Sequence, residues 1–452
     1  MGLKETLRRN EKLVLKVILL LVFFSIFLMV PGIIVTLDYW PNCALSYNIA
    51  TEHTFYLDNF LFVYENTSSQ NLSYFDYPQF EIQWGDGPWY FRKVGGHLVS
   101  TYPPTIPLLG APVYFIANIF VPGDLFSGSD LKAYILAVGK INGAFLTTIS
   151  VLIVWLFLNA TKSKHADALV LIYGCATLVL PSTHSLNNHV GGLIFLPLAW
   201  LFAYKSIKNP KDIGYAGLFA ALAYTARPTN IASLGILLLY SIFTKKDWKR
   251  FVIFALIPLF FLWSYNYFIF GSPFTSGYGI LFFKLDTGEP ASFFDLFYIN
   301  PINITQNLAA NLFSPNRGIF MFSPILLFSL PGMFIALKEK KLDFYKWVFA
   351  ALILTLLILS SWKLWTGGLR YGYTMALDTI PYFIFFISIY ADKIFSNKFL
   401  FYVFVFLAII SFLIAIVGIT YGCDWSSQPV CIDLAQERAW DFNDLQILRC
   451  FS

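Results

Sequence analysis

The feature that most constrains this chain is a series of long apolar runs separated by short polar connections. A helix that crosses the hydrocarbon core of a membrane needs about 20 mostly apolar residues. Only 13% of the 452 residues are charged, against roughly 25% in soluble domains, which excludes a water-soluble fold. The runs are 13–37, 134–159, 166–183, 189–206, 213–226, 230–243, 249–270, 317–337, 345–361, 374–391 and 398–421. They predict an all-α polytopic membrane protein with about eleven membrane-spanning helices.

Charge placement supports this set of helices, because basic residues accumulate in cytoplasmic loops. With the N-terminus inside, every second connection is cytoplasmic, and these connections hold nineteen of the 31 Lys and Arg residues, whereas 18 of the 26 Asp and Glu residues lie outside. We therefore expect a multi-pass protein of the plasma (inner) membrane with a cytoplasmic N-terminus. The inner basic residues are Lys4, Arg8, Arg9, Lys12, Lys162, Lys164, Lys205, Lys208, Lys211, Lys245, Lys246, Lys249, Arg250, Lys338, Lys340, Lys341, Lys346, Lys393 and Lys398.

Two apolar segments near the N-terminus decide this count. The run 13–37 is about 25 residues long, whereas the apolar region of a signal peptide has only about 7–15, so we expect a retained first helix. Residues 105–120 are also apolar, but counting them as a span would invert every later loop. We therefore predict an interfacial or re-entrant helix on the outer face, beginning after Tyr102-Pro103-Pro104, since Pro favours the first turn of a helix.

One pair of runs is ambiguous. Arg227-Pro228-Thr229-Asn230 separates 213–226 from 230–243, which gives either two helices or one long kinked helix. The predicted organisation is a transmembrane domain over 1–421, with outer loops 38–133 and 271–316, and an outer-face tail over 422–452.

Three arginines depart from the distribution of basic residues, since each lies at the outer mouth of a predicted helix. They are Arg227, Arg317 and Arg370. A guanidinium is a planar fork that fits phosphate, so a converging set would bind a lipid phosphate or diphosphate. The alternative is that these side chains snorkel towards lipid head groups or helix-end carbonyls.

Two carboxylates are candidates for chemistry. Asp38 follows the first helix beside Tyr39 and Trp40, where partial desolvation suits a general base; it is equally a solvated residue at a helix end. Asp378 shares a helical face with Arg370 at a spacing of eight. It would lie about a turn inside the membrane, where an ionisable group is functional or paired, so a structural pair with Arg370 is the alternative.

Further candidates for substrate contact lie on the predicted outer side. They are Asp58, Asp86 and Tyr102 in the first outer loop and His189 at the start of a helix. Aromatic rings with carboxylates favour sugar contact, although a lone interfacial His is often structural and outer carboxylates are often solvated. No cysteine or histidine cluster has zinc spacing, and Cys423 and Cys431 are either bridged or free thiols.

Several function classes are excluded by missing signals. The sequence contains no phosphate-binding loop, dinucleotide fingerprint, zinc-protease motif or serine-hydrolase elbow. Basic residues are dispersed among short loops, which makes nucleic-acid binding implausible.

An ordered series of motifs resembles a known group, the GT-C superfamily of integral membrane glycosyltransferases. It is most similar to the prokaryotic branch described as dolichyl-phosphate-mannose mannosyltransferase-like. The motifs are Asp38-Tyr39-Trp40, Gly96-His97-Leu98-Val99-Ser100-Thr101-Tyr102-Pro103-Pro104, Asn188-His189, Arg227-Pro228-Thr229-Asn230, Phe270-Gly271-Ser272-Pro273-Phe274-Thr275-Ser276-Gly277-Tyr278, Phe313-Ser314-Pro315-Asn316-Arg317-Gly318 with Phe322-Ser323-Pro324, Gly367-Gly368-Leu369-Arg370-Tyr371 and Ala439-Trp440-Asp441-Phe442.

The resemblance implies transfer of a sugar from a polyprenyl-phosphate donor to a glycan, glycolipid or protein acceptor at the outer face. It implies that Asp38 is the base and that the sugar carbon is inverted, with the three arginines stabilising the leaving phosphate. Many relatives carry two neighbouring acids where this chain has Asp38-Tyr39-Trp40. A second acid would come from Asp58 or elsewhere, which leaves a divalent cation possible.

Two other functions stay open from the sequence. One is a non-catalytic translocator of lipid-linked sugar or a partner of a polymerase. The other is a secondary transporter, although the chain shows no inverted repeat and almost no charge at the predicted midplane. Trp362-Lys363-Leu364-Trp365 does not match the motif of oligosaccharyltransferases, which argues against that activity.

Overall fold

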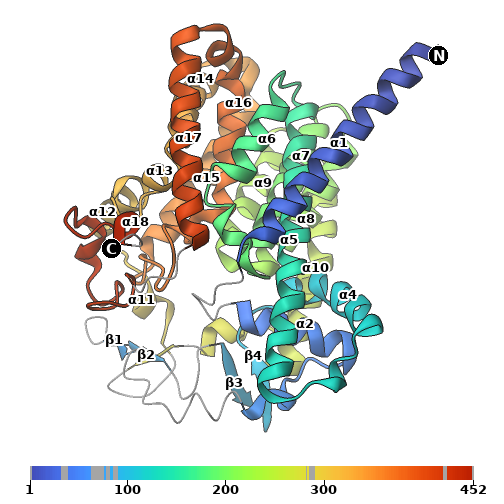
Figure 1. The fold of residues 1–452 in the computed structure, drawn as a ribbon, viewed down its shortest axis with the longest axis vertical. Coiled ribbons are helices and arrows are strands. Elements are labelled where there is room, and N and C mark those ends of the chain that lie inside the picture. The colour runs from blue at the N-terminus through green and yellow to red at the C-terminus, as the bar shows by residue number, and fades with distance from the viewer. Residues whose placement is uncertain are drawn as a thin grey trace.

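The computed structural model describes residues 3–31, 39–62, 76–77, 82–84, 90–280, 282–284, 291–420 and 425–449, and helices dominate it (Figure 1). Each predicted apolar run contains helix, which confirms the helical class. The helices of these runs are α1 (Leu3–Met29), α5 (Gly128–Ala160), α6 (Ala166–Cys175), α7 (His189–Lys205), α8 (Ile213–Ala226), α9 (Ile231–Phe243), α10 (Trp248–Phe270), α13 (Ile319–Phe322), α14 (Ser329–Lys338), α15 (Asp343–Ser361), α16 (Ile380–Ser396) and α17 (Lys398–Thr420).

Five helical segments of the described chain are long and apolar enough to cross a membrane. They are Gly128–Ala160, Trp248–Phe270, Lys340–Ser361, Thr374–Ser396 and Lys398–Ile419. The last has a mean hydropathy of 3.0 yet only 17% of it is buried, an arrangement that water would penalise and lipid would not. These helices are consistent with a membrane protein. The apolar helical segments of the other runs, including Lys16–Met29 of α1, have at most 17 residues, so the number of eleven spans stays a prediction.

The long helices form one bundle, in the upper part of Figure 1, with the loop elements below it. Helix α5 lies inside, in contact with α1, α6 and α7, while α8 packs between α7 and α10. Helix α1 begins at the upper end of the view, whereas α2 (Trp40–Thr51) and α4 (Thr105–Phe120) lie at the lower end. The start of α7, the end of α8 and the start of α16 lie together, so polar residues from distant parts of the sequence meet there.

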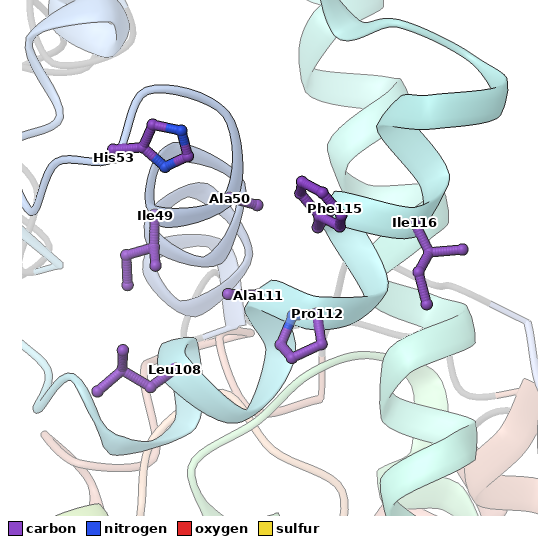
Figure 2. A pocket seen from close by; sticks show the side chains of 8 residues that line it. All are labelled: Ile49, Ala50, His53, Leu108, Ala111, Pro112, Phe115 and Ile116. Atoms are coloured by element: carbon purple, nitrogen blue, oxygen red, sulfur yellow. The ribbon is translucent and has the colours of Figure 1, made fainter.

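The helix predicted over 105–120 is present as α4, with the predicted bounds. It packs against α2 and α5. An open apolar groove of about 470 Å³ runs between α2 and α4 (Figure 2). Its lining includes Ile49, Leu108 and Phe115, with the ring of His53 at one end.

Two small sheets are a departure from the all-α prediction. Strands β3 (Phe91–Val94) and β4 (His97–Ser100) form a hairpin. Strands β1 (Asp76–Tyr77), β2 (Ile82–Trp84) and β5 (Phe282–Lys284) form an antiparallel sheet in the order β1-β2-β5. Because β2 lies in the predicted loop 38–133 and β5 in the predicted loop 271–316, this sheet joins the two loops.

The ambiguous pair of runs forms two helices, α8 and α9. Arg227 between them is extended, with φ −153° and ψ 117°. A residue before proline avoids the helical region, so Pro228 ends α8 at Ala226. Pro228 then opens the short 3-10 helix η8 (Pro228–Asn230), which leads into α9. The sequence Arg-Pro is thus the local cause of the break.

Candidate functional site

A buried polar cluster forms where α8 ends and where α7 and α16 begin, and Asp378 lies at its centre. One carboxylate oxygen of Asp378, Oδ1, lies 2.8 Å from Nδ1 of His189. The other, Oδ2, accepts hydrogen bonds from Nη1 of Arg227 at 3.2 Å and from Nδ2 of Asn230 at 3.1 Å. Arg370 extends the set, because its Nη1 lies 3.2 Å from Nε2 of His189. These five residues are called the His189 cluster below.

Three short segments carry the members of the His189 cluster. His189 is the first residue of α7, and its amide donates to Oδ1 of Asn187 at 2.9 Å. Arg227 stands in the break after α8, where its Nη1 also donates to the carbonyl of Met375 at 2.7 Å. Asp378 lies in the 3-10 helix η12 (Thr374–Thr379) that precedes α16. The backbone N–H and C=O groups at a helix end lack partners within the helix, so polar side chains gather there to bind them.

A glycine makes the central contact possible. An ideal Cβ on Gly192 would lie 2.7 Å from Oδ2 and 2.8 Å from Cβ of Asp378. Any side chain at this position of α7 would therefore push η12 away. Gly192 is one turn after His189, so the same turn of α7 supplies both the imidazole and the space for the carboxylate.

The hydrogen-bond partners assign the tautomer of His189. Arginine has donors only, so the Nε2 atom that faces Arg370 must be the acceptor. The proton then lies on Nδ1 and is donated to Asp378. The approach of Arg227 Nη1 to the same Nδ1 at 3.2 Å is consequently a contact between two donors. Asp378 thereby orients the ring and presents the Nε2 lone pair towards Arg370.

The His189 cluster is almost closed to solvent. Asp378 is 1% exposed, His189 4% and Arg227 7%. Arg370 is half-buried and is the most exposed of the five residues. The cluster contains two guanidinium groups and one carboxylate, so its named members carry more positive than negative charge. Buried charge of one sign attracts a counter-ion strongly, because the local dielectric constant is low.

Arg370 is positioned by a glycine-rich loop between α15 and η12, residues 362–373, which is called the glycine loop below. Gly367 and Gly368 have φ of 76° and 68°, a left-handed conformation that glycine adopts at little cost. The carbonyl of Arg370 accepts hydrogen bonds from Oγ of Ser426 at 3.1 Å and Nε2 of Gln446 at 2.8 Å. Both of these residues belong to the described tail, 425–449.

Arg317 lies outside the His189 cluster and binds acceptors of the protein itself. Its side chain is 0% exposed, and its five N–H groups are matched by five protein acceptors. These are the carbonyls of Thr366, Gly368 and Asn316, Oε1 of Gln446 and Oγ of Ser426, at 2.8–3.1 Å. Arg317 therefore joins the end of α12 (Pro301–Phe313) to the glycine loop and the tail.

A buried carboxyl, Asp433, supports the same loop. It accepts hydrogen bonds from the hydroxyl of Thr366 and from the amide of Gly368. Burial raises the pKa of Asp433 above its ordinary value, although these hydrogen bonds and the nearby Arg317 and Arg370 act in the opposite direction. The tail thus contributes a carboxyl whose charged form is disfavoured.

Tyr102 lies against the loop that follows α10. Its ring packs edge-on against Tyr278, with centroids 5.6 Å apart. The close approach requires Gly277, since a Cβ there would clash with the carbonyl of Thr101. The hydroxyl of Tyr278 accepts from Nδ2 of Asn188 at 3.5 Å. Asn188 precedes His189, so Tyr102 and Tyr278 lie next to the His189 cluster.

Asp58 is engaged in a local pair in the first outer loop. Its carboxylate lies 2.7 Å from Nδ1 of His97 and accepts the amide of Leu98 at 2.7 Å. Partial burial acts to raise the pKa of Asp58, but these two hydrogen bonds outweigh it and the pKa is lowered. His97 also stacks on Tyr56 at 4.1 Å. The structure therefore places Asp58 in a pair that anchors β4 rather than in the His189 cluster.

Two predicted residues, Asp38 and Asp86, lie outside the described residues. Tyr39, which follows Asp38 in the sequence, is described and is 3% exposed. Its ring packs against His184 with centroids 5.5 Å apart. His184 ends the 3-10 helix η6 (Pro181–His184), five residues before His189.

The prediction that Arg370 and Asp378 share one face of a helix is wrong. Arg370 lies in the loop before η12, and Ala376 interrupts that 3-10 helix with φ −94° and ψ 15°. The two ends of the supposed face nevertheless both contact His189. They meet through the imidazole of another helix instead of along one helix.

In the described part of the chain, no group of three His, Cys, Asp or Glu side chains is placed to hold a metal ion. Cys43, Cys175 and Cys431 are free thiols there, while Cys423 lies outside the described residues.

Several residues of this region have no role that the sequence pattern predicts. Asn230 belongs to the Arg-Pro-Thr-Asn segment and Tyr278 to a Gly-Tyr segment, and neither pattern indicates what these side chains contact. Gln446 and Asp433 lie in a tail without motif spacing. Their partners outside the tail are more than 60 residues away in the sequence, so no local signal identifies them.

Comparison of the chain with protein-family models, with curated proteins and with solved structures finds no match.

Proposed function

We propose that this chain is a membrane-embedded glycosyltransferase that moves a sugar from a polyprenyl-phosphate donor to an acceptor at the outer face. In this proposal the fold is GT-C-like with eleven spans. The observation that carries it is the His189 cluster, a nearly buried group with two guanidiniums around one carboxylate at the ends of apolar helices. Such a group suits a substrate that combines a lipid chain with a phosphate.

The donor phosphate would contact Arg370 first, because Arg370 is the half-buried member of the cluster. Arg227 is 7% exposed and donates to Asp378 and Met375, so its part would be mainly the positive charge beneath the phosphate. Arg317, with its donors directed to protein acceptors, would support the loop rather than bind the donor. Positive charge at this place would stabilise the phosphate as the sugar leaves it.

The sugar would lie on the side of Tyr102, Tyr278 and Asn188. Aromatic faces and amide groups are suited to the apolar faces and hydroxyls of a sugar. These three side chains contact one another in series beside His189. Asp58, which pairs with His97, would shape the first outer loop from a distance.

Asp38 would act as the general base. Its carboxylate would take the proton of the acceptor hydroxyl as that oxygen attacks the anomeric carbon. The bond between the anomeric carbon and the phosphate oxygen breaks, polyprenyl phosphate leaves, and the sugar carbon is inverted. The packing of Tyr39 against His184, five residues before His189, supports a first outer loop that starts beside the cluster.

The groove between α2 and α4 would accept part of a lipid chain. It is lined mainly by aliphatic and aromatic side chains (Figure 2). Ile49 is seven residues along α2 from Asn42, about 10 Å at 1.5 Å per residue, and Asn42 donates to Asn188 at 2.9 Å. A prenyl chain would span that length.

Complementation of cells that lack the gene tests the proposal. We compare wild type, Asp38→Asn and, as a matched control, Asp124→Asn, whose carboxylate is exposed in the same outer loop. Mass spectrometry of membrane glycolipids and surface glycans is the readout. We expect Asp38→Asn to lower the transferred product about a hundredfold or more and Asp124→Asn to restore it. Full restoration by Asp38→Asn would contradict the proposed base.

A further inference from the structure

Two glutamines of the tail hold the glycine loop at its two ends. Near the start of the loop, Gln436 donates from Nε2 to the carbonyl of Lys363 at 2.6 Å, and its Oε1 accepts from the indole of Trp365 at 2.8 Å. Near the end, Gln446 contacts Arg370 and Gly372. Gln436 lies in η13 (Gln436–Trp440) and Gln446 begins α18 (Gln446–Arg449).

Gln446 uses its whole amide. It is 0% exposed. Its Oε1 accepts from Nη1 of Arg317 at 2.8 Å and from the amide of Gly372 at 3.0 Å. Its Nε2 donates to the carbonyl of Arg370 at 2.8 Å and to Oγ of Ser426 at 3.2 Å. The amide oxygen thus accepts from Arg317, and the amide nitrogen donates to the backbone of Arg370, whose side chain contacts His189.

The loop itself supplies little rigidity around Arg370. Gly367 and Gly368 precede it and Gly372 follows it, all with positive φ, and glycine is the residue with the greatest backbone freedom. A guanidinium that must lie 3.2 Å from Nε2 of His189 therefore needs an external hold on its backbone. Gln446 and Ser426 provide that hold through the Arg370 carbonyl.

We infer that Gln446 is a positioning residue for anion binding at Arg370, so that the tail completes the phosphate site. The inference rests on the proposed function, since it concerns the arginine assigned to the donor phosphate. Gln446 does not itself touch the anion. It fixes the Arg370 backbone and so reduces the conformational freedom that phosphate binding would otherwise remove.

One substitution separates the two halves of the Gln446 amide. In Gln446→Glu, one carboxylate oxygen still accepts from Arg317, so the tail stays attached to the protein. The other oxygen replaces the N–H group that donates to the Arg370 carbonyl, and two acceptors then face each other. Gln436→Glu is the matched control, because it makes the same chemical change in the same tail but acts on Lys363 instead of Arg370.

The measurement is binding of farnesyl phosphate to the purified full-length protein, with farnesol as the uncharged probe. We expect Gln446→Glu to weaken farnesyl phosphate binding about tenfold with farnesol binding unchanged, and Gln436→Glu to bind both as wild type does. Wild-type affinity for farnesyl phosphate in Gln446→Glu would overturn the inference. An equal loss for both probes, or the same loss in Gln436→Glu, would overturn it too, because general damage would then explain the effect.

Two further variants keep the test decisive. Ser426→Ala removes the second donor to the Arg370 carbonyl and is the test to use if Gln446→Glu does not fold. We expect it to weaken binding of farnesyl phosphate but not of farnesol. An unchanged affinity for farnesyl phosphate would contradict the inference.

Arg370→Gln tests the phosphate role itself. If Arg370→Gln binds farnesyl phosphate as wild type does, the proposed phosphate site fails. If only Arg370→Gln loses affinity, the site stands and the positioning role of Gln446 fails.

Discussion

Gly192 and Asp378 are in contact across the junction of α7 and η12, and the absence of a side chain at Gly192 lets Asp378 reach His189. A Cβ on Gly192 would lie 2.7 Å from Oδ2 of Asp378. The imidazole and the carboxylate meet at 2.8 Å. The geometry of the His189 cluster thus depends on one position where even a methyl group is too large.

Gly192→Ala tests this relationship. We expect the methyl group to displace Asp378 and to destabilise the protein by about 1–3 kcal/mol, the usual cost of overpacking. Thermal unfolding in detergent is the measurement. Gly235→Ala is the matched control, because Gly235 lies in α9 with nothing within 4 Å of its Cβ position; it should be neutral or stabilising by up to about 1 kcal/mol. Equal stability of the two variants would count against the close contact.

Arg370→Lys separates charge from geometry at the proposed phosphate site. Lysine keeps the positive charge but loses the planar fork, so we expect affinity for farnesyl phosphate to fall about tenfold with little change in thermal stability. Arg449→Lys, in the tail and paired with Asp444 at 3.5 Å, serves as control. If the Arg370→Lys protein binds farnesyl phosphate as tightly as wild type does, the planar guanidinium of Arg370 is not needed for phosphate binding.

Arg317→Lys should act on stability instead. The substitution removes at least two of the five buried hydrogen bonds of Arg317, because lysine has three N–H donors and arginine five, which costs at least about 2 kcal/mol. We expect a lower unfolding temperature and faster limited proteolysis of the tail. If Arg317→Lys folds normally and loses only phosphate affinity, Arg317 is a ligand and the supporting role is wrong.

Asp433 gives the protein a dependence on pH with a defined sign. Because burial raises the pKa of Asp433 in the folded protein, the folded state binds a proton more tightly than the unfolded state. The stabilising contribution is complete below the ordinary pKa of 3.8 and is lost as pH rises through the raised value. Asp433→Asn keeps the acceptor oxygen without the charge.

The Asp433→Asn protein should therefore be more stable than wild type at neutral pH, with a difference that shrinks as the pH is lowered towards about 4. Unfolding temperatures measured across pH 4 to 8 give the comparison. A difference that grows on acidification would show that the charged carboxylate stabilises the fold, contrary to the direction of the shift.

The helices were predictable because apolar runs and basic connections are local signals. The runs containing α5, α10 and α17 needed no information from elsewhere in the chain. The pairing of β2 with β5 was not predictable, since it joins segments about 200 residues apart. The supposed helix through Arg370 and Asp378 was wrong because spacing alone cannot detect the glycine loop and the 3-10 helix between them.

The candidate site was predictable in its residue types and less so in its roles. His189, Arg227, Arg370 and Asp378 were selected as polar residues at the outer ends of apolar helices, and the structure brings all four together. Arg317 lies at a similar place in the sequence, but acceptors in the loop after α15, in the tail and on Asn316 together engage all its donors. Sequence position shows where a guanidinium emerges from a helix and does not show which acceptors the tertiary fold brings to it.

The central claim is transfer of a sugar from a lipid phosphate, and it is tested most directly with purified protein and membrane lipid extract from cells that lack the gene. Mass spectrometry follows polyprenyl-phosphate sugars, free polyprenyl phosphate and glycosylated acceptors together. The account predicts that wild-type protein converts one lipid-phosphate sugar into polyprenyl phosphate with an equal gain of sugar on an acceptor, and that Asp38→Asn does not. An unchanged lipid pool, or equal conversion by Asp38→Asn, would contradict it.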